Sequence, residues 1–133
     1  MDKLEYIPRD IVSVYVGIKK YIVKIIGVEY ENEVLSYRVE FINGEIQYAD
    51  KDNIVPIPLT PEILEKNGWG NFSDGFYLYR YSNEECVGIG LSSQTGYIWK
   101  ALIGGRLLRS NINSVSDLQH LLYGLNINHK MEV

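Results

Sequence analysis

Residues 34–49 have the sequence VLSYRVEFINGEIQYA, and this stretch decides the fold class. From Val34 to Ile42, apolar and polar side chains alternate with a period of two, which is typical of a strand with one buried face. Asn43-Gly44 follows, a dipeptide that favours a hairpin because both residues tolerate a positive φ angle. Residues 45–49 then predict the returning strand. The stretch therefore predicts an antiparallel hairpin.

The rest of the first half predicts three further strands, at residues 11–16, 21–30 and 54–58. Gly27 interrupts the second of them, which indicates a bulge or a sharp bend. Pro56 and Pro58 place the last strand at an edge, because proline donates no ladder hydrogen bond. Five short strands within about 50 residues cannot hide an apolar face in an open sheet, so we expect a small, strongly bent, SH3-like barrel over residues 8–58.

The second half begins with a short helix at about residues 61–67. Thr60 is its expected N-cap, Pro61 fits the first helical position, and Gly68 lies where a glycine ends a helix. Residues 76–81, 86–91, 97–103 and 106–109 then predict a four-stranded antiparallel meander. A C-terminal amphipathic helix follows, because leucines recur at helical spacing after the capping residues Ser114 and Asp117.

These elements predict a mainly β (α+β) protein with two parts. Residues 1–58 are expected to form the SH3-like β-barrel, and residues 59–133 the short helix, the β-meander and the C-terminal helix. Whether both parts share one core stays open at this point.

The composition is that of an ordinary globular domain. The chain has 133 residues and a net charge of −4, with 46% hydrophobic and 23% charged residues. Cys86 is the only cysteine, which excludes an intrachain disulfide and a cysteine-based zinc site and suits a reducing compartment. The N-terminus lacks the apolar run of a signal peptide, and no stretch approaches the ~18 apolar residues of a membrane span. We therefore expect a cytoplasmic protein that does not associate with membranes.

No set of residues predicts catalysis, a cofactor, a metal ion or a small-molecule ligand. Two histidines, His120 and His129, are too few to complete a metal site. Cys86 lies in a strand-like segment, where a small core residue is the ordinary interpretation. Residues 88–93 contain two glycines but precede a turn and a strand, whereas a phosphate-binding loop precedes a helix. Carboxylates such as Glu29 and Asp50 are interpreted as solvated turn residues.

The late strands offer the candidate interaction surface. Residues 86–116 contain three basic residues and no acidic residue, although the chain as a whole is acidic. Tyr97 and Trp99 share one face of a strand, as a base-stacking platform requires. A stripe of three tyrosines in the predicted strand at residues 76–81 offers apolar area with polar tips, which suits a protein interface. The complete candidate surface comprises Tyr77, Tyr79, Tyr81, Tyr97, Trp99, Lys100, Arg106 and Arg109.

Two segments resemble a known family. Residues 57–69 have the sequence IPLTPEILEKNGW, and residues 115–125 have the sequence VSDLQHLLYGL. Together they resemble a family of small uncharacterised proteins common in Bacteroidetes genomes and their prophages, with an I-P-L-T-x-E-x-L-x-x-x-G-F/W segment and a C-terminal L-Q-x-L-Y-type helix. This chain departs from the pattern at Ser116, where histidine is usual, and in the register of Leu122-Tyr123. The resemblance implies a phage or mobile-element setting and no particular activity.

These observations predict a non-catalytic binding or interaction module. Its expected partner is another protein or a second copy of the chain. The alternative is nucleic-acid binding through the basic, aromatic strands at 97–109. A third alternative is an enzyme with a dispersed site, which no pattern in the sequence indicates.

Overall fold

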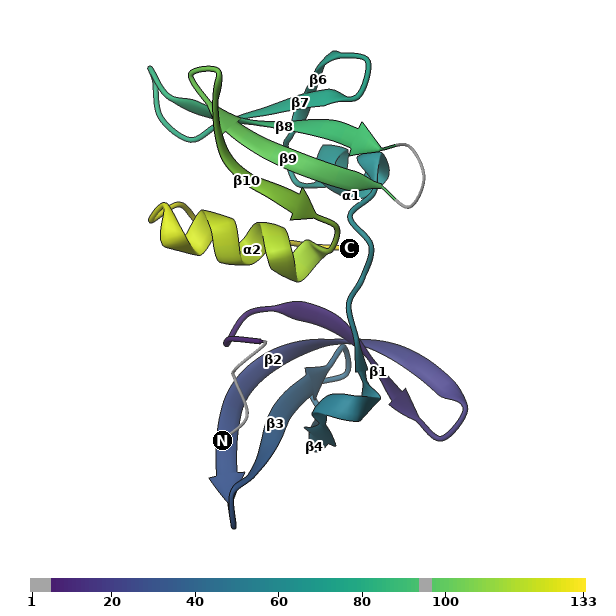
Figure 1. The fold of residues 1–133 in the computed structure, drawn as a ribbon. Coiled ribbons are helices and arrows are strands. Elements are labelled where there is room, and N and C mark those ends of the chain that lie inside the picture. Colours follow the sequence, from purple (N-terminus) through teal and green to yellow (C-terminus); the bar gives the residue numbers. More distant parts are fainter. Residues whose placement is uncertain (1–5, 94–96) are drawn as a thin grey trace. The chain divides into compact units, whose positions relative to one another are not determined.

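The computed structural model describes residues 6–93 and 97–133 and divides the chain into two compact units (Figure 1). Unit 1 comprises Met1–Ile57 and unit 2 comprises Pro58–Val133, so the boundary lies one residue before the expected one. Each unit contains one five-stranded antiparallel sheet, and unit 2 adds two α-helices. The coarse expectation of a mainly β chain with α+β character is confirmed. Neither of these α-helices has the length and apolar character that crossing a membrane requires.

The strands of unit 1 form a meander whose last strand returns to the first. They are β1 (Ile11–Val16), β2 (Lys19–Glu31), β3 (Val34–Phe41), β4 (Ile46–Asp50) and β5 (Ile54–Val55). A 3-10 helix at Lys51–Asn53 links β4 to β5, and the order in the sheet is β4-β3-β2-β1-β5. β4 and β5 are therefore the two edges, and the sheet is not a closed barrel. β5 is shorter than the expected 54–58 because proline at 56 and 58 cannot donate to a ladder.

Alternation along the strands builds the core of unit 1. The inward-facing side chains of β1, β2 and β3 form one buried cluster with Tyr6, Ala49 and Ile54. β2 pairs with β1 through its first half and with β3 through its second half. The β2–β3 register shifts between Ile25 and Gly27, which confirms the bulge expected at this glycine.

The hairpin turns differ from the expected ones in their details. The β3–β4 hairpin forms where Asn43-Gly44 predicted it, but only Gly44 has a positive φ, of 88°. The Phe41 N–H donates to the Glu45 carbonyl, which leaves a three-residue loop. A tight two-residue turn lies between β2 and β3, where Asn32 and Glu33 have φ angles of 51° and 64°. Positive φ at both central residues is the mark of a type I′ turn.

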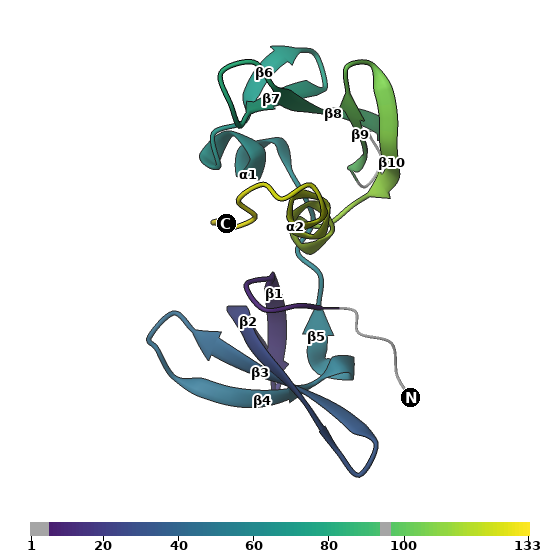
Figure 2. The ribbon, with the colours of Figure 1, turned by 90° about the vertical axis from the view of Figure 1, so that its left-hand side faces the viewer.

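Unit 2 contains one strand more than expected. Its strands are β6 (Gly70–Ser73), β7 (Phe76–Arg80), β8 (Cys86–Ser93), β9 (Ile98–Ile103) and β10 (Arg106–Ile112), in the order β10-β9-β8-β7-β6. The prediction of four strands was wrong because β6 has the sequence GNFS, in which three of four residues disfavour strands. The sheet curves, and both α1 (Pro61–Lys66) and α2 (Val115–Gly124) lie on its concave side (Figure 2).

The expected helix caps are confirmed. The Ile63 N–H donates to Thr60 Oγ1 at the start of α1, and the Asp117 N–H donates to Ser114 Oγ at the start of α2. Leu59 lies just before α1, and its carbonyl accepts a hydrogen bond of 2.8 Å from Nε1 of the buried Trp99 indole. The segment around Leu59 is thus an anchor that holds the start of unit 2 to its sheet.

The C-terminal tail belongs to the packed part of unit 2. Asn67, at the end of α1, donates from Nδ2 to the Glu132 carbonyl and accepts from the Glu132 N–H at Oδ1. The Gln119 side chain of α2 donates to the His129 carbonyl. Ile127 and Met131 are buried. These contacts attach residues 126–133 to both helices.

Candidate functional site

An open pocket of about 470 Å³ lies at one end of the unit 1 core. It is lined by Val16, Tyr21, Ile22, Phe41, Ile42, Asn43, Glu45 and Gln47. Val16 of β1 continues the inward-facing stripe that starts with the buried Val12 and Val14. Tyr21 and Phe41 continue the corresponding stripes of β2 and β3. The pocket therefore lies at the end of the unit 1 core, where inward-facing side chains of three strands are open to solvent.

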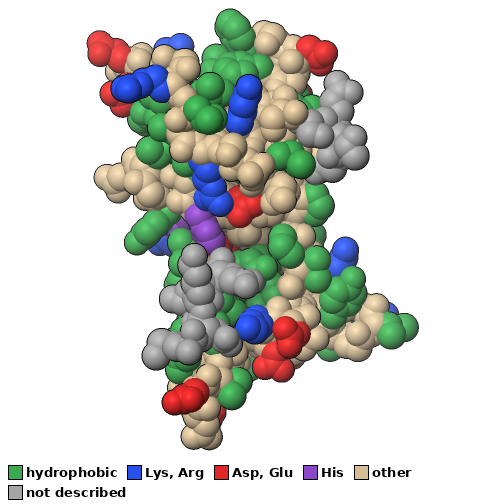
Figure 3. Space-filling model, in the orientation of Figure 1, with side chains coloured by type: hydrophobic (Ala, Val, Ile, Leu, Met, Phe, Trp, Pro, Cys, Tyr) green, Lys and Arg blue, Asp and Glu red, His purple; other side chains and the backbone are tan. Residues whose placement is uncertain are grey.

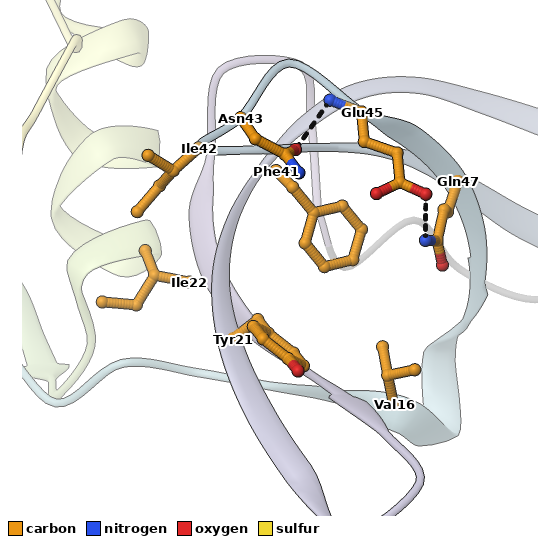
Figure 4. A pocket seen from close by; sticks show the side chains of 8 residues that line it. All are labelled: Val16, Tyr21, Ile22, Phe41, Ile42, Asn43, Glu45 and Gln47. Atoms are coloured by element: carbon orange, nitrogen blue, oxygen red, sulfur yellow. Dashed lines mark hydrogen bonds between the residues drawn. The ribbon is translucent and has the colours of Figure 1, made fainter.

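The lining residues come from two hairpins that end side by side. Val16, Tyr21 and Ile22 belong to the β1–β2 hairpin, and the others belong to the β3–β4 hairpin. Figure 4 shows Tyr21, Phe41, Glu45 and Gln47 projecting toward one opening, with Ile22 and Ile42 beside each other on its outer side. The Tyr21 and Phe41 rings meet edge to face, with centroids 5.7 Å apart.

The rim of the pocket is unusually apolar for a surface. Ile42 is 91% exposed, and Ile18, at the tip of the β1–β2 hairpin, is 97% exposed. Ile22, which lines the pocket beside Ile42, is also exposed. Single exposed apolar residues are common, but neighbouring ones at one opening are typical of a contact site.

One side of the pocket is polar and pre-ordered. Asn43 Oδ1 accepts from the Glu45 N–H, and Gln47 Nε2 donates to Glu45 Oε1, each at 2.9 Å. Among the described residues of the lining, Glu45 is the charged one. The Glu45 carboxylate, bonded to the Gln47 amide, and the Asn43 amide, bonded to the Glu45 backbone, give the apolar opening one polar edge (Figure 4).

A second, smaller pocket of about 130 Å³ adjoins the first, and the two share Val16, Phe41 and Gln47. Its walls include residues 14–16 of β1 and residues 47–50 of β4. No ladder joins β1 to β4. The two pockets therefore form one continuous groove along the side of the sheet where β1 and β4 remain apart.

Apolar and aromatic side chains make up most of the described lining of the groove. Its charged residues are the carboxylates Glu45 and Asp50. Within residues 6–93 and 97–133, no group of three or more His, Cys, Asp or Glu side chains could hold a metal ion. Cys86 begins β8 and is exposed, so its interpretation as a core residue was wrong; burial in this strand starts one residue later, at Val87. His120 lies on α2, and His129 packs its ring against Tyr123.

Two members of the surface predicted from sequence are buried. Trp99 is 0% exposed and contacts Tyr77 edge to face, and Tyr77 itself is buried. This part of the prediction was wrong because α1 and α2 cover the face of the sheet on which both side chains lie. Tyr79 is half-buried and stacks on Trp69, with ring centroids 5.3 Å apart. Tyr81 is half-buried, and Tyr97 is exposed.

The three cations of the predicted surface do not share a face. Arg109 reaches Asp117 of α2, with Nη2 and Oδ1 3.6 Å apart, and so belongs to the helix side of the sheet. Lys100 lies opposite Gly90 on the other side, and Arg106 is at the β9–β10 turn. On the face shown in Figure 3, Lys and Arg side chains are scattered among apolar and acidic ones.

Comparison of the chain with protein-family models, curated proteins and solved structures finds no match. The site therefore rests on its own geometry. The sequence did not predict this pocket, because alternation shows which side chains face inward but not whether another part of the fold covers them. The available sign was the row of isoleucines in and beside the hairpin turns, at Ile18, Ile42 and Ile46.

Proposed function

We propose that this chain is a non-catalytic binding module in which the groove of unit 1 binds an apolar segment of another protein. The observation that supports this most directly is the pocket of about 470 Å³ in which core-facing side chains stay open to solvent. Covering such side chains contributes about 25 cal/mol per Å² of apolar surface removed from water.

Further features favour a protein segment over a small molecule. The pocket is open along its length, whereas a small-molecule site usually encloses most of its ligand. The exposed isoleucines extend the apolar area beyond the pocket itself. An apolar centre with a polar edge is the usual composition of a protein interface.

We also infer that unit 1 is an SH3-like barrel left open on one side. Support comes from the four-stranded meander, the 3-10 helix after β4 and the return of β5 to β1. The phage or mobile-element setting is inferred from the resemblance of residues 57–69 and 115–125, and the cytoplasmic location from the single cysteine.

Peptide selection tests the proposed function. The full chain is used to select from a phage-displayed library of random dodecapeptides, and the selected peptides are synthesised for binding measurements. We expect apolar peptides that bind the wild-type chain, and we expect Val16→Glu to weaken their binding at least about tenfold, because it places an uncompensated charge in the opening.

Val34→Glu is the matched control. Val34 is a strand residue of the same unit, is 59% exposed against 47% for Val16, and lines neither pocket. Equal loss in both variants, or no selected peptide at all, would reject the proposal. Concentration-dependent dimerisation of the wild-type chain that Val16→Glu abolishes would instead identify a second copy as the partner.

Nucleic-acid binding through residues 97–109 receives less support. A stacking platform needs exposed rings beside aligned cations, and here Trp99 is buried and Arg109 is paired. A gel-shift titration with single-stranded DNA at low salt decides this alternative, because electrostatic binding is strongest there. A shift that Lys100→Glu removes would revive it.

A further inference from the structure

We propose that the partner segment binds in the groove as an extended strand that pairs with the free edge of β4. This inference rests on the proposed function and adds to it the backbone conformation and the charge of the ligand. Strand addition of this kind combines main-chain hydrogen bonds for affinity with side-chain pockets for specificity.

The alternation of hydrogen-bonded and non-hydrogen-bonded pairs between β3 and β4 shows which backbone groups of β4 point away from β3. The Phe41 N–H donates to the Glu45 carbonyl, and the strands then pair with Val39 opposite Gln47 and Tyr37 opposite Ala49. In an antiparallel ladder, hydrogen-bonded pairs alternate with pairs whose N–H and C=O groups point away. The groups of Ile46, Tyr48 and Asp50 therefore point to the free edge, where β4 has no neighbouring strand among the described residues.

The opposite wall of the groove is also incompletely paired. β5 pairs with Ser13 and Val14 of β1 and ends there. β1 continues to Val16, and its residues 14–16 face the smaller pocket together with Gln47 and Tyr48 of β4. An added strand would thus lie against β4 with the end of β1 as its other wall.

The edge and the pockets together define the ligand. An extended backbone presents donors and acceptors at the two-residue spacing of the outward groups of β4. Alternate side chains of that strand would enter the pockets beside Phe41 and Val16, so those positions should be apolar. The charged residues of the two linings are Glu45 and Asp50, both acidic. Charge complementarity therefore predicts Lys or Arg next to the apolar positions.

Methylation of the peptide backbone tests the pairing directly. In the tightest peptide selected on the full chain, each backbone nitrogen is methylated in turn, which removes one donor at a time. We expect alternate positions to lose about fivefold to tenfold in affinity, the equivalent of one hydrogen bond, and the intervening positions to lose little. A loss that does not alternate would overturn strand addition.

Exchange of the β4 amides is the second readout. In the ¹⁵N-labelled full chain, saturating peptide should slow hydrogen exchange of the Ile46 and Tyr48 amides about tenfold or more, and leave the exposed amides of the β6–β7 turn unchanged. Tyr48→Pro, which removes an outward N–H, should weaken binding more than Tyr48→Ala, which keeps it. Binding without edge protection would refute strand addition and leave the proposed function intact, whereas absence of binding would reject both.

Discussion

Gly88 makes room for an aromatic ring on the outer face of the unit 2 sheet. It lies in β8 opposite Leu78 of β7, and a Cβ atom added to it would approach Phe76 Cζ to 2.7 Å. Gly90, two residues further, would place its Cβ 3.3 Å from the same ring. The two glycines that suggested a phosphate loop in the sequence thus form the floor on which the Phe76 ring lies.

We therefore expect Gly88→Ala to destabilise unit 2 by about 1–3 kcal/mol, the usual cost of overpacking, since the Phe76 ring must move. Urea denaturation followed by tryptophan fluorescence measures this effect, because Trp69 and Trp99 are both buried in unit 2. Gly124→Ala is the control: no atom lies within 4 Å of its added Cβ, and it ends α2, so stability should rise by up to about 1 kcal/mol. Wild-type stability for Gly88→Ala would show that the ring yields freely.

At the scale of elements, the turn between β2 and β3 carries a residue that is unfavourable for its conformation. Glu33 has a φ of 64°, and a side chain in the left-handed region costs about 1–2 kcal/mol. We expect Glu33→Gly to stabilise unit 1 by about 0.5–1 kcal/mol, because it creates the Asn-Gly pair that a type I′ turn favours.

Thermal unfolding followed by far-ultraviolet circular dichroism measures the change at Glu33. Gly44→Ala is the comparison variant and should destabilise unit 1. The φ angle of Gly44 is 88° and no atom lies within 4 Å of the added Cβ, so the only cost is backbone strain of about 1–2 kcal/mol. If Glu33→Gly lowered the midpoint, the turn would owe its stability to the glutamate side chain.

Most elements could be predicted from the sequence where local chemistry determines them. The caps at Thr60 and Ser114 and the bulge at Gly27 are local features, and the structure contains all of them. β6 was missed because its sequence has little strand propensity, so it is held by pairing with β7. The positive φ angles of Asn32 and Glu33 could not be predicted in the same way, because this pair lacks the glycine that usually marks such a turn.

Which face of a sheet is covered depends on the whole molecule. For this reason the surface predicted from the sequence was partly wrong. Alternation in β7 separates Tyr77 from Phe76, but it contains no information on which set the helices will cover. That choice depends on α1 and α2 packing against the sheet, and it buried Tyr77 and Trp99. In unit 1, Val16 and Tyr21 face inward and are exposed, because no element of that unit within the described residues covers this end of its core.

Burial of Tyr77 also makes the stability of unit 2 sensitive to alkaline pH. Desolvation raises the pKa of Tyr77 above the usual value of 10.0, and the carboxylates of Glu65, Glu62 and Asp74 raise it further. The folded state therefore holds this proton more tightly than the unfolded state. The resulting stability is fully present below about pH 10 and is lost as the pH rises through the raised pKa.

We accordingly expect the free energy of unfolding of the intact chain, measured through tryptophan fluorescence in unit 2, to fall as the pH rises above about 10. Tyr77→Phe removes the ionisable group, so its stability should fall less steeply over the same pH range. Tyr123→Phe, which changes an exposed tyrosine of the same unit, should follow the wild-type slope. Only a group whose pKa differs between the folded and unfolded states makes the free energy of unfolding depend on pH. Identical pH dependence in Tyr77→Phe and the wild type would therefore mean that another group governs alkaline unfolding.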